Sequence, residues 1–122
     1  MSVKILAIDD SRTIREMLRE ALTSAGFVVD LAVDGLDGLD RVRVFSPDVV
    51  ITDINMPRMN GFEFITAVRK NIKKTALPIL VLTTESAQDL KEKARAAGAT
   101  AWIVKPFDGD RLVSAIKRVS VM

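Results

Sequence analysis

The sequence has no histidine and no cysteine among its 122 residues. Without histidine, the chain lacks the commonest general base, the commonest metal ligand and any phosphohistidine of its own. Without cysteine, it has no disulfides and shows no sign of export. Any chemistry on this chain must therefore use carboxylates, hydroxyls and lysines.

The sequence also lacks long apolar runs and a cluster of basic residues. No run approaches the roughly 20 residues that a membrane-spanning helix needs, and the apolar run near the N-terminus is too short for a secretory signal. The net charge is +2, and the basic residues are scattered rather than gathered on one face, as nucleic-acid binding would require. We expect a cytoplasmic protein that binds neither membranes nor nucleic acids. Its length predicts one domain, residues 1–122, with no output domain.

Short apolar runs alternate with helical patterns along the whole chain. The apolar runs predict five strands, at residues 3–8, 28–32, 49–52, 79–82 and 102–104. Apolar residues at helical spacing predict five helices, of which the second is weakened by Gly35 and Gly38. The third helix carries on one face Phe62, Ile65, Val68 and Ile72. Strict alternation predicts an α/β fold, with a parallel sheet covered by helices on both faces.

Polar residues follow four of the five predicted strands. The first strand is followed by Asp9 and Asp10, the third by Asp53, the fourth by Thr83 and the fifth by Lys105. Ligands of open α/β sheets bind outside the carboxyl ends of the strands. Each residue alone has an ordinary explanation: helix capping for the paired acids, a turn for the third acid, strand filling for the threonine and solvation for the lysine. Together they place complementary groups at one edge of one sheet.

The grouping of these residues makes chemical sense. Three crowded carboxylates repel one another, and a hard divalent cation such as Mg²⁺ relieves that repulsion. Magnesium sites of this kind are usually completed by a phosphate. Lys105 and the Thr83 hydroxyl suit phosphoryl oxygens, and one carboxylate is left to act as a nucleophile that forms an acyl phosphate.

Four motifs carry a resemblance to a known family: the Asp9-Asp10 pair, Asp53 within DINMPRMNGFE, Thr83 within LTTES, and KPF beginning at Lys105. In this order and at this spacing they resemble the receiver domain of two-component response regulators over the whole chain, most of all the CheY-like single-domain members. The resemblance implies the flavodoxin-like receiver fold, a doubly wound five-stranded parallel sheet in the order 2-1-3-4-5 with five helices. It also implies a cis peptide before Pro106.

The resemblance assigns the chemistry of phosphorylation to three residues. Asp53 would accept a phosphoryl group from the phosphohistidine of a CheA-like histidine kinase. Lys105 would pair with the phosphoryl group, and Thr83 would swing in to hydrogen-bond it. A donor histidine on another protein agrees with the absence of histidine from this chain.

Mg²⁺ is the cofactor that the resemblance implies. Asp10 and Asp53, with the backbone carbonyl of Asn55, would hold the ion, and Asp9 would act through a bound water. Asn55 and Glu85 match residues that influence the attack of water on the acyl phosphate in the family. They imply a short-lived phosphoryl state and a phosphatase as a further partner, while a turn asparagine and an exposed glutamate are the alternative interpretations.

The resemblance also predicts how the signal leaves the site. Trp102 occupies, by spacing, the aromatic switch position that acts with Thr83, while the alternative is that the only tryptophan is a core anchor. The output face would comprise the fourth helix, the fifth strand and the last helix, with Lys91, Lys93, Arg95 and Lys117. A solvated helix surface explains these charges equally well. We expect a monomeric switch that binds a target such as the flagellar motor switch, in chemotaxis.

Three other functions compete with this hypothesis. A phosphorelay intermediate or phosphate sink would use the same chemistry, and the sequence does not separate it from a switch. A small Mg²⁺-dependent phosphohydrolase would need an acid two residues after Asp53, where the chain has Asn55. A flavin- or cobalamin-binding domain would need a phosphate loop or a ligating histidine, and the chain has neither. We therefore expect a phosphoacceptor that supports its own phosphorylation and autodephosphorylation rather than an enzyme.

Overall fold

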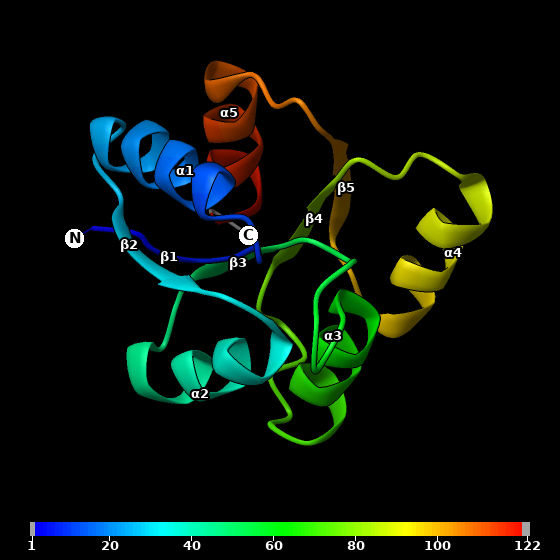
Figure 1. Ribbon diagram of the computed structural model, residues 1–122. Coiled ribbons are helices and arrows are strands. Elements are labelled where there is room, and N and C mark those ends of the chain that lie inside the picture. The colour runs from blue at the N-terminus through cyan, green and yellow to red at the C-terminus, as the bar shows by residue number, and fades with distance from the viewer. Residues whose placement is uncertain (1, 121–122) are drawn as a thin grey trace.

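The computed structural model describes residues 2–120, which form five strands and five helices in strict alternation (Figure 1). The elements are β1 (Lys4–Ile8), α1 (Arg12–Ser24), β2 (Val28–Ala32), α2 (Gly35–Phe45), β3 (Val49–Thr52), α3 (Gly61–Lys70), β4 (Ile79–Thr83), α4 (Gln88–Ala97), β5 (Ala101–Val104) and α5 (Gly109–Ser120). The predicted α/β fold is confirmed. No helix within the described residues is long and apolar enough to cross a membrane.

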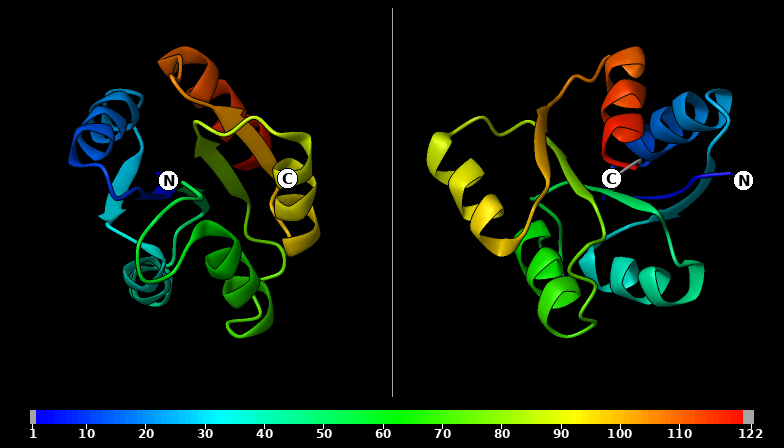
Figure 2. Two further views of the ribbon diagram at one scale, coloured as in Figure 1. Left: turned by 45° about the vertical axis from the view of Figure 1, so that its right-hand side comes forward. Right: turned by 180° about the vertical axis from the view of Figure 1, so that it is seen from behind.

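The strands form one parallel sheet in the order β2-β1-β3-β4-β5. Helices α1 and α5 cover one face, and α2, α3 and α4 cover the other (Figures 1 and 2). The chain moves outward from β1 to β2 and then returns to place β3 on the other side of β1. Strand order therefore reverses between β1 and β3, which is where open sheets of this kind bind ligands. The doubly wound order predicted from the resemblance is confirmed.

The central strands are buried on both faces, which explains why they are almost continuously apolar. All four residues of β3 are buried. Val49 and Ile51 pack in one core cluster with Leu18 of α1 and Ile116 of α5, whereas Val50 packs in the other cluster with α2, α3 and α4. Alternate residues of one strand thus hold the two helical layers onto the sheet.

Helix α3 buries a slightly different face from the one expected. Ile65 and Val68 are fully buried, as predicted, but Phe62 and Ile72 pack against the core only as partly buried residues. Phe64, which the helical spacing did not single out, is fully buried between the expected positions.

The two glycines that weaken α2 allow close approach. A Cβ at Gly35 would lie 2.5 Å from the carbonyl oxygen of Met59, and one at Gly38 would lie 2.5 Å from Cδ1 of Ile8. Helix α2 therefore packs tightly against both β1 and the loop that follows β3. The loss in helix propensity is the cost of bringing α2 close to the sheet and this loop.

Candidate functional site

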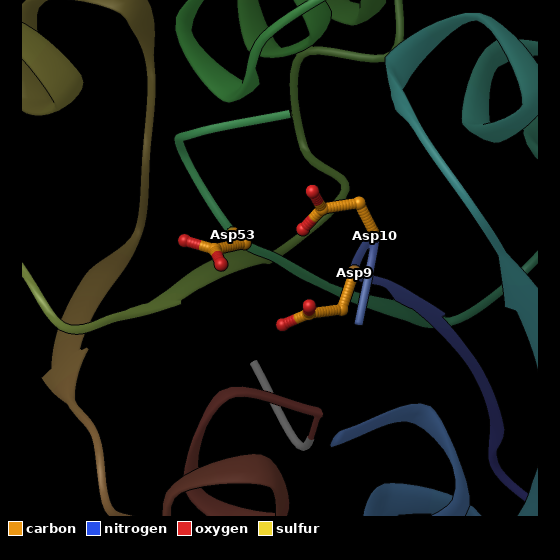
Figure 3. Close-up of side chains that lie close together, drawn as sticks. All are labelled: Asp9, Asp10 and Asp53. Carbon is orange, nitrogen blue, oxygen red and sulfur yellow. The ribbon is translucent and has the colours of Figure 1, made fainter. Parts of the chain in front are cut away.

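Three carboxylates meet where strand order reverses, at the carboxyl ends of β1 and β3 (Figure 3). Asp9, Asp10 and Asp53 each offer an oxygen, and these oxygens lie within 4.8 Å of one another. Ile8 pairs with Thr52 across the two strands, and the Asp53 amide donates to the carbonyl of Ile8 at 3.0 Å. The strand register therefore brings the following acids together. Asp9 and Asp53 are buried, whereas Asp10 is exposed.

Lys105 bridges the two buried acids. Its Nζ lies 2.7 Å from Oδ2 of Asp9 and 2.9 Å from Oδ2 of Asp53. The backbone of Lys105 follows β5 and donates to the carbonyl of Thr83 at 2.7 Å, and its peptide bond to Pro106 is cis, as expected. The ammonium group thus offsets charge on two carboxylates that would otherwise repel each other.

Burial and charge pairing shift the pKa values of Asp9 and Lys105 in opposite directions. Burial raises the pKa of Asp9 above its usual value, although the hydrogen bonds from Lys105 and from the amide of Ser11 oppose that shift. Burial alone would lower the pKa of Lys105, but the hydrogen bonds and the charge attraction of Asp9 and Asp53 together outweigh burial and raise the pKa. Lys105 therefore keeps its proton and remains a cation between the acids.

Helix capping does not account for the paired acids. The N-cap of α1 is Ser11, whose hydroxyl accepts a hydrogen bond from the Ile14 amide at 3.3 Å. Asp9 instead accepts from the Ser11 amide at 2.9 Å, while Arg15 donates to the Asp9 carbonyl at 2.8 Å. These contacts fix the start of α1 and turn the Asp9 side chain toward Lys105.

The Asp53 side chain is fixed at both oxygens. Its Oδ1 accepts from the Ile54 amide at 2.7 Å, and its Oδ2 accepts from Lys105. Two residues later, Asn55 is exposed, and its Nδ2 lies 3.5 Å from Oε1 of Glu85. The two residues expected to influence phosphoryl lifetime therefore face each other beside the acids. A metal-binding role for the Asn55 carbonyl stays a prediction.

The expected switch residues are linked through the backbone of Glu85. Thr83 is fully buried at the end of β4, and its hydroxyl accepts from the Glu85 amide at 3.4 Å. Trp102 donates from Nε1 to the Glu85 carbonyl at 3.0 Å and packs, partly buried, against the core cluster of α2, α3 and α4. Trp102 thus has the contacts of a core anchor and a direct hydrogen bond to the loop after Thr83.

The basic residues of the expected output face differ in their contacts. Lys93 lies over the ring of Phe62, with its Nζ 4.4 Å from the ring centroid, and so ties α4 to α3. Lys91 and Arg95 line a groove beside Trp102 with a volume of about 160 Å³. Lys117 is exposed on α5. Only part of this positive charge is therefore a freely solvated helix surface.

Sequence reasoning missed an ion pair next to the site. Asp34 is almost fully buried and binds Arg58 of the loop after β3. Asp34 precedes a glycine at the start of a predicted helix, which is a recognisable N-cap signal. Its pairing with an arginine 24 residues away has no local sequence signal.

A family model described as the response regulator receiver domain matches residues 5–117. Among curated proteins, the response regulators MprA of Mycobacterium bovis and Mycobacterium tuberculosis are 38% identical to this chain over 119 residues. The match covers 96% of this chain and 50% of each relative. The chain thus spans about half the length of the curated relatives that it matches.

Solved structures show the same likeness over nearly full lengths. The chemotaxis response regulator CheY4 of Vibrio cholerae is 44% identical, with a TM-score of 0.91, and the match covers 98% of this chain and 99% of that chain. A chain from Chloroflexus aurantiacus that is described as a response regulator is 31% identical, with a TM-score of 0.93 and complete coverage of both chains.

Proposed function

This chain belongs to the response regulator receiver domain family, and on that premise we propose that Asp53 is its phosphoacceptor. The observation that carries the proposal is the meeting of Asp53 with Asp9, Asp10 and Lys105 at one edge of the sheet. Asp53 ends a buried strand and is held by the Ile54 amide, so its carboxylate is fixed in place before a donor arrives.

The transfer follows from the contacts of these residues. A carboxylate oxygen of Asp53 attacks phosphorus, and the new P–O bond forms as the P–N bond to the imidazole of the kinase breaks. The imidazole leaves with the electron pair and takes up a proton. The Lys105 ammonium then faces the added negative charge. The Thr83 hydroxyl accepts a bond from the Glu85 amide, and it would leave this amide when it turns to donate its own proton to a phosphoryl oxygen.

The three carboxylates fit Mg²⁺, because they supply hard oxygen ligands within one small site. Asp10 and Asp53, with the Asn55 carbonyl, would hold the ion, and Asp9 would act through a water. When bound, Mg²⁺ neutralises charge on the carboxylates and on the phosphoryl oxygens. Asp10 is the exposed member of the set, while Lys105 already pairs with the two buried acids.

The signal would pass from Thr83 to Trp102 through Glu85. When Thr83 turns toward the phosphoryl group, the Glu85 amide loses its side-chain acceptor. The loop between β4 and α4 then shifts, and Trp102 follows because its Nε1 is bonded to the Glu85 carbonyl. A target protein would read the change on α4, β5 and α5. Asn55 and Glu85, which contact each other beside Asp53, would set the access of water to the acyl phosphate.

We place this switch in chemotaxis, as a cytoplasmic monomer with a CheA-like kinase as donor and the flagellar motor switch as target. The support is the likeness to CheY4, which is named as a chemotaxis response regulator and which the chain matches over nearly its whole length. The MprA relatives are named only as response regulators and are about twice as long. The alternative function is that of a phosphorelay intermediate or phosphate sink, and the partner experiments below distinguish it from a chemotaxis switch.

Incubation with acetyl phosphate and Mg²⁺ tests the proposed phosphoacceptor. The intact mass of the wild-type chain should rise by about 80 Da, the mass of one phosphoryl group bound to a nucleophile. Asp53→Ala should gain nothing, while Asp40→Ala, at an exposed acid on α2, should behave as the wild type. An equal gain on Asp53→Ala would refute the assignment.

The partner is tested separately. Phosphotransfer profiling against the histidine kinases of the same cell identifies the donor. Capture by a purified flagellar switch protein only after phosphorylation supports the chemotaxis switch. Onward transfer to another histidine protein, without such capture, would identify a relay or sink instead.

A further inference from the structure

A two-pronged ion pair ties the loop after β3 to the start of α2. This loop comprises residues 53–60. Arg58 donates from Nε to Oδ2 of Asp34 at 2.6 Å and from Nη2 to Oδ1 at 3.1 Å. Oδ1 of Asp34 also accepts from the Asp37 amide at 2.9 Å, which caps α2. One carboxylate therefore fixes both the first turn of α2 and the loop that begins at Asp53.

The backbone reinforces this contact at neighbouring positions. Gly35 donates its amide to the Met59 carbonyl at 3.0 Å, at a point where a side chain on residue 35 would overlap with Met59. Arg58 itself has φ +63°, a left-handed conformation that is uncommon for residues other than glycine. A backbone hydrogen bond and a side-chain ion pair at adjacent positions thus join this loop to the start of α2.

The pair is more than an ordinary surface contact. The Asp34 side chain is only 4% exposed, although the Arg58 side chain is 58% exposed, whereas pairs in which both side chains are exposed contribute little. Two parallel bonds from a guanidinium group fix direction as well as distance. The hydrogen bonds from Arg58 hold the pKa of Asp34 below its usual value, so the acid stays charged at neutral pH. Capping of α2 would need the carboxylate alone and does not explain the arginine.

We propose that the Asp34–Arg58 pair positions the loop after β3 so that the Asn55 carbonyl can join Asp10 and Asp53 in binding Mg²⁺. This inference rests on the proposed function, because it concerns the same metal site. Asn55 lies between Asp53 and Arg58, and the far end of the loop is closed by a hydrogen bond from the Gly61 amide to the Ile54 carbonyl at 2.9 Å. Arg58 is a positioning residue, since it acts through the loop and not on the ion.

Calorimetric titration of the full chain with Mg²⁺ alone tests the proposal. Arg58→Asn tolerates the left-handed backbone but loses the two-pronged contact. Loss of such supporting contacts weakens metal binding, here by about tenfold in Kd. Arg58→Lys, which keeps one charged donor, should restore part of the affinity. Arg41→Asn is the matched control. Arg41 pairs with Asp30 at 3.5 Å and with Asp37 at 3.6 Å, and neither acid belongs to this loop. The Arg41→Asn variant should therefore bind Mg²⁺ as the wild type does.

Hydrogen exchange without metal gives a second readout. Amides of residues 54–56, 58 and 59 should exchange faster in Arg58→Asn and in Asp34→Asn, a change that keeps a good capping side chain. The double variant should resemble Arg58→Asn, because both changes break one contact. A Kd that rises less than about threefold in Arg58→Asn would overturn the proposal, as would unchanged exchange in the loop. Failure of the wild type to gain a phosphoryl group would instead overturn the proposed function, so the two failures are distinguishable.

Discussion

At the scale of single residues, the site is a balance between burial and pairing. Asp9 and Asp53 lie in the interior, and Lys105 reaches both of them at 2.7 and 2.9 Å. Even so, burial dominates at Asp9 and raises the pKa of its carboxyl group. The native chain therefore carries a carboxylate that would be better solvated in the unfolded chain, which is a common cost of a functional site.

This balance predicts how stability changes with pH when Asp9 is replaced. The pKa of Asp9 is higher in the folded chain than the usual 3.8. As pH rises, the unfolded chain therefore loses this proton at a lower pH than the folded chain does. The free energy of unfolding falls between the unfolded pKa and the higher folded pKa. The variant Asp9→Asn removes this loss of stability, because residue 9 no longer titrates. The asparagine oxygen can still accept a hydrogen bond from the Ser11 amide, and Lys105 still pairs with Asp53. Urea unfolding in EDTA should show the variant to be more stable at pH 7.

The difference between the two proteins should shrink as the pH falls from the folded pKa toward 3.8, and it should vanish well below 3.8, where the wild-type acid is protonated in both states. A variant that is less stable than the wild type at pH 7 would contradict the prediction. It would mean that pairing with Lys105 outweighs burial.

Much of the site could be predicted from the residues at strand ends. Parallel strands bring their carboxyl ends to one edge, so acids after β1 and β3 must meet there, and they do. The Lys105 contacts could not be predicted in detail, because the course of the chain after β5 decides which acids it reaches. The role of Arg58 could not be predicted because its partner, Asp34, lies in another loop. Hydrophobic periodicity carries no information about an ion pair between two loops.

At the scale of elements, α4 begins without a side-chain hydrogen bond at its N-cap. Its N-cap is Ala87, which has an extended backbone but no side chain that can cap. Ala94 is its only buried residue, and Lys93 adds a contact to Phe62 of α3. By contrast, the caps of α1, α2 and α3 are Ser11, Asp34 and Asn60, each with a side-chain hydrogen bond. A loosely fixed α4 suits an element that is expected to move on phosphorylation.

Adding a cap should therefore stabilise α4. Ala87→Asp places a carboxylate at a position that already has capping geometry, and this should contribute about 1 kcal/mol. For a domain of this size the melting temperature should rise by about 4 °C. Differential scanning calorimetry measures the change, and hydrogen exchange should slow first in α4.

The matched control is Ala96→Asp, at the exposed C-terminal end of the same helix. There the negative charge meets the negative end of the helix dipole and should lower stability. Equal melting temperatures for the two variants would show that charge alone, and not capping, determines the result.

Elements were easier to predict than their faces. The predicted strand at residues 49–52 has the observed bounds of β3, because an interior strand is apolar on both sides. On α3, the helical spacing placed Phe62 on the core face, where it packs as a partly buried residue, but it did not single out Phe64, which is fully buried. Phe64 lies beneath the close approach of α2, since a Cβ at Gly38 would lie 3.1 Å from Cε1 of its ring.

At the scale of the whole molecule, strand order was the feature that local patterns did not determine. Alternation of strands and helices predicts a parallel sheet, but several strand orders satisfy it. The order β2-β1-β3-β4-β5 was expected from the family resemblance and is confirmed. The order matters for function, because it brings three acids and one lysine from β1, β3 and β5 to one edge.

The same arrangement couples metal binding to the stability of the entire fold. An unfolded chain scatters the three acids, so Mg²⁺ should bind the native state alone and stabilise it. At a concentration ten times its Kd, the gain should be about 1.4 kcal/mol, or about 6 °C in melting temperature. Thermal unfolding with and without EDTA measures it. Asp10→Asn removes the exposed ligand and should lose most of the shift, and a full shift in that variant would contradict the proposed metal site.

The variant Lys105→Met distinguishes the contribution of the Lys105 ammonium group to stability from that of Mg²⁺ at these acids. Without its ammonium group, Asp9 and Asp53 lose their nearest positive charge, so the metal-free variant should be less stable by about 3 kcal/mol. Mg²⁺ should then restore more stability to this variant than it gives the wild type, because the ion no longer competes with Lys105 for the buried carboxylates. An equal gain in the variant would show that lysine and metal act on different groups of the site, and a smaller gain would show that Lys105 supports metal binding.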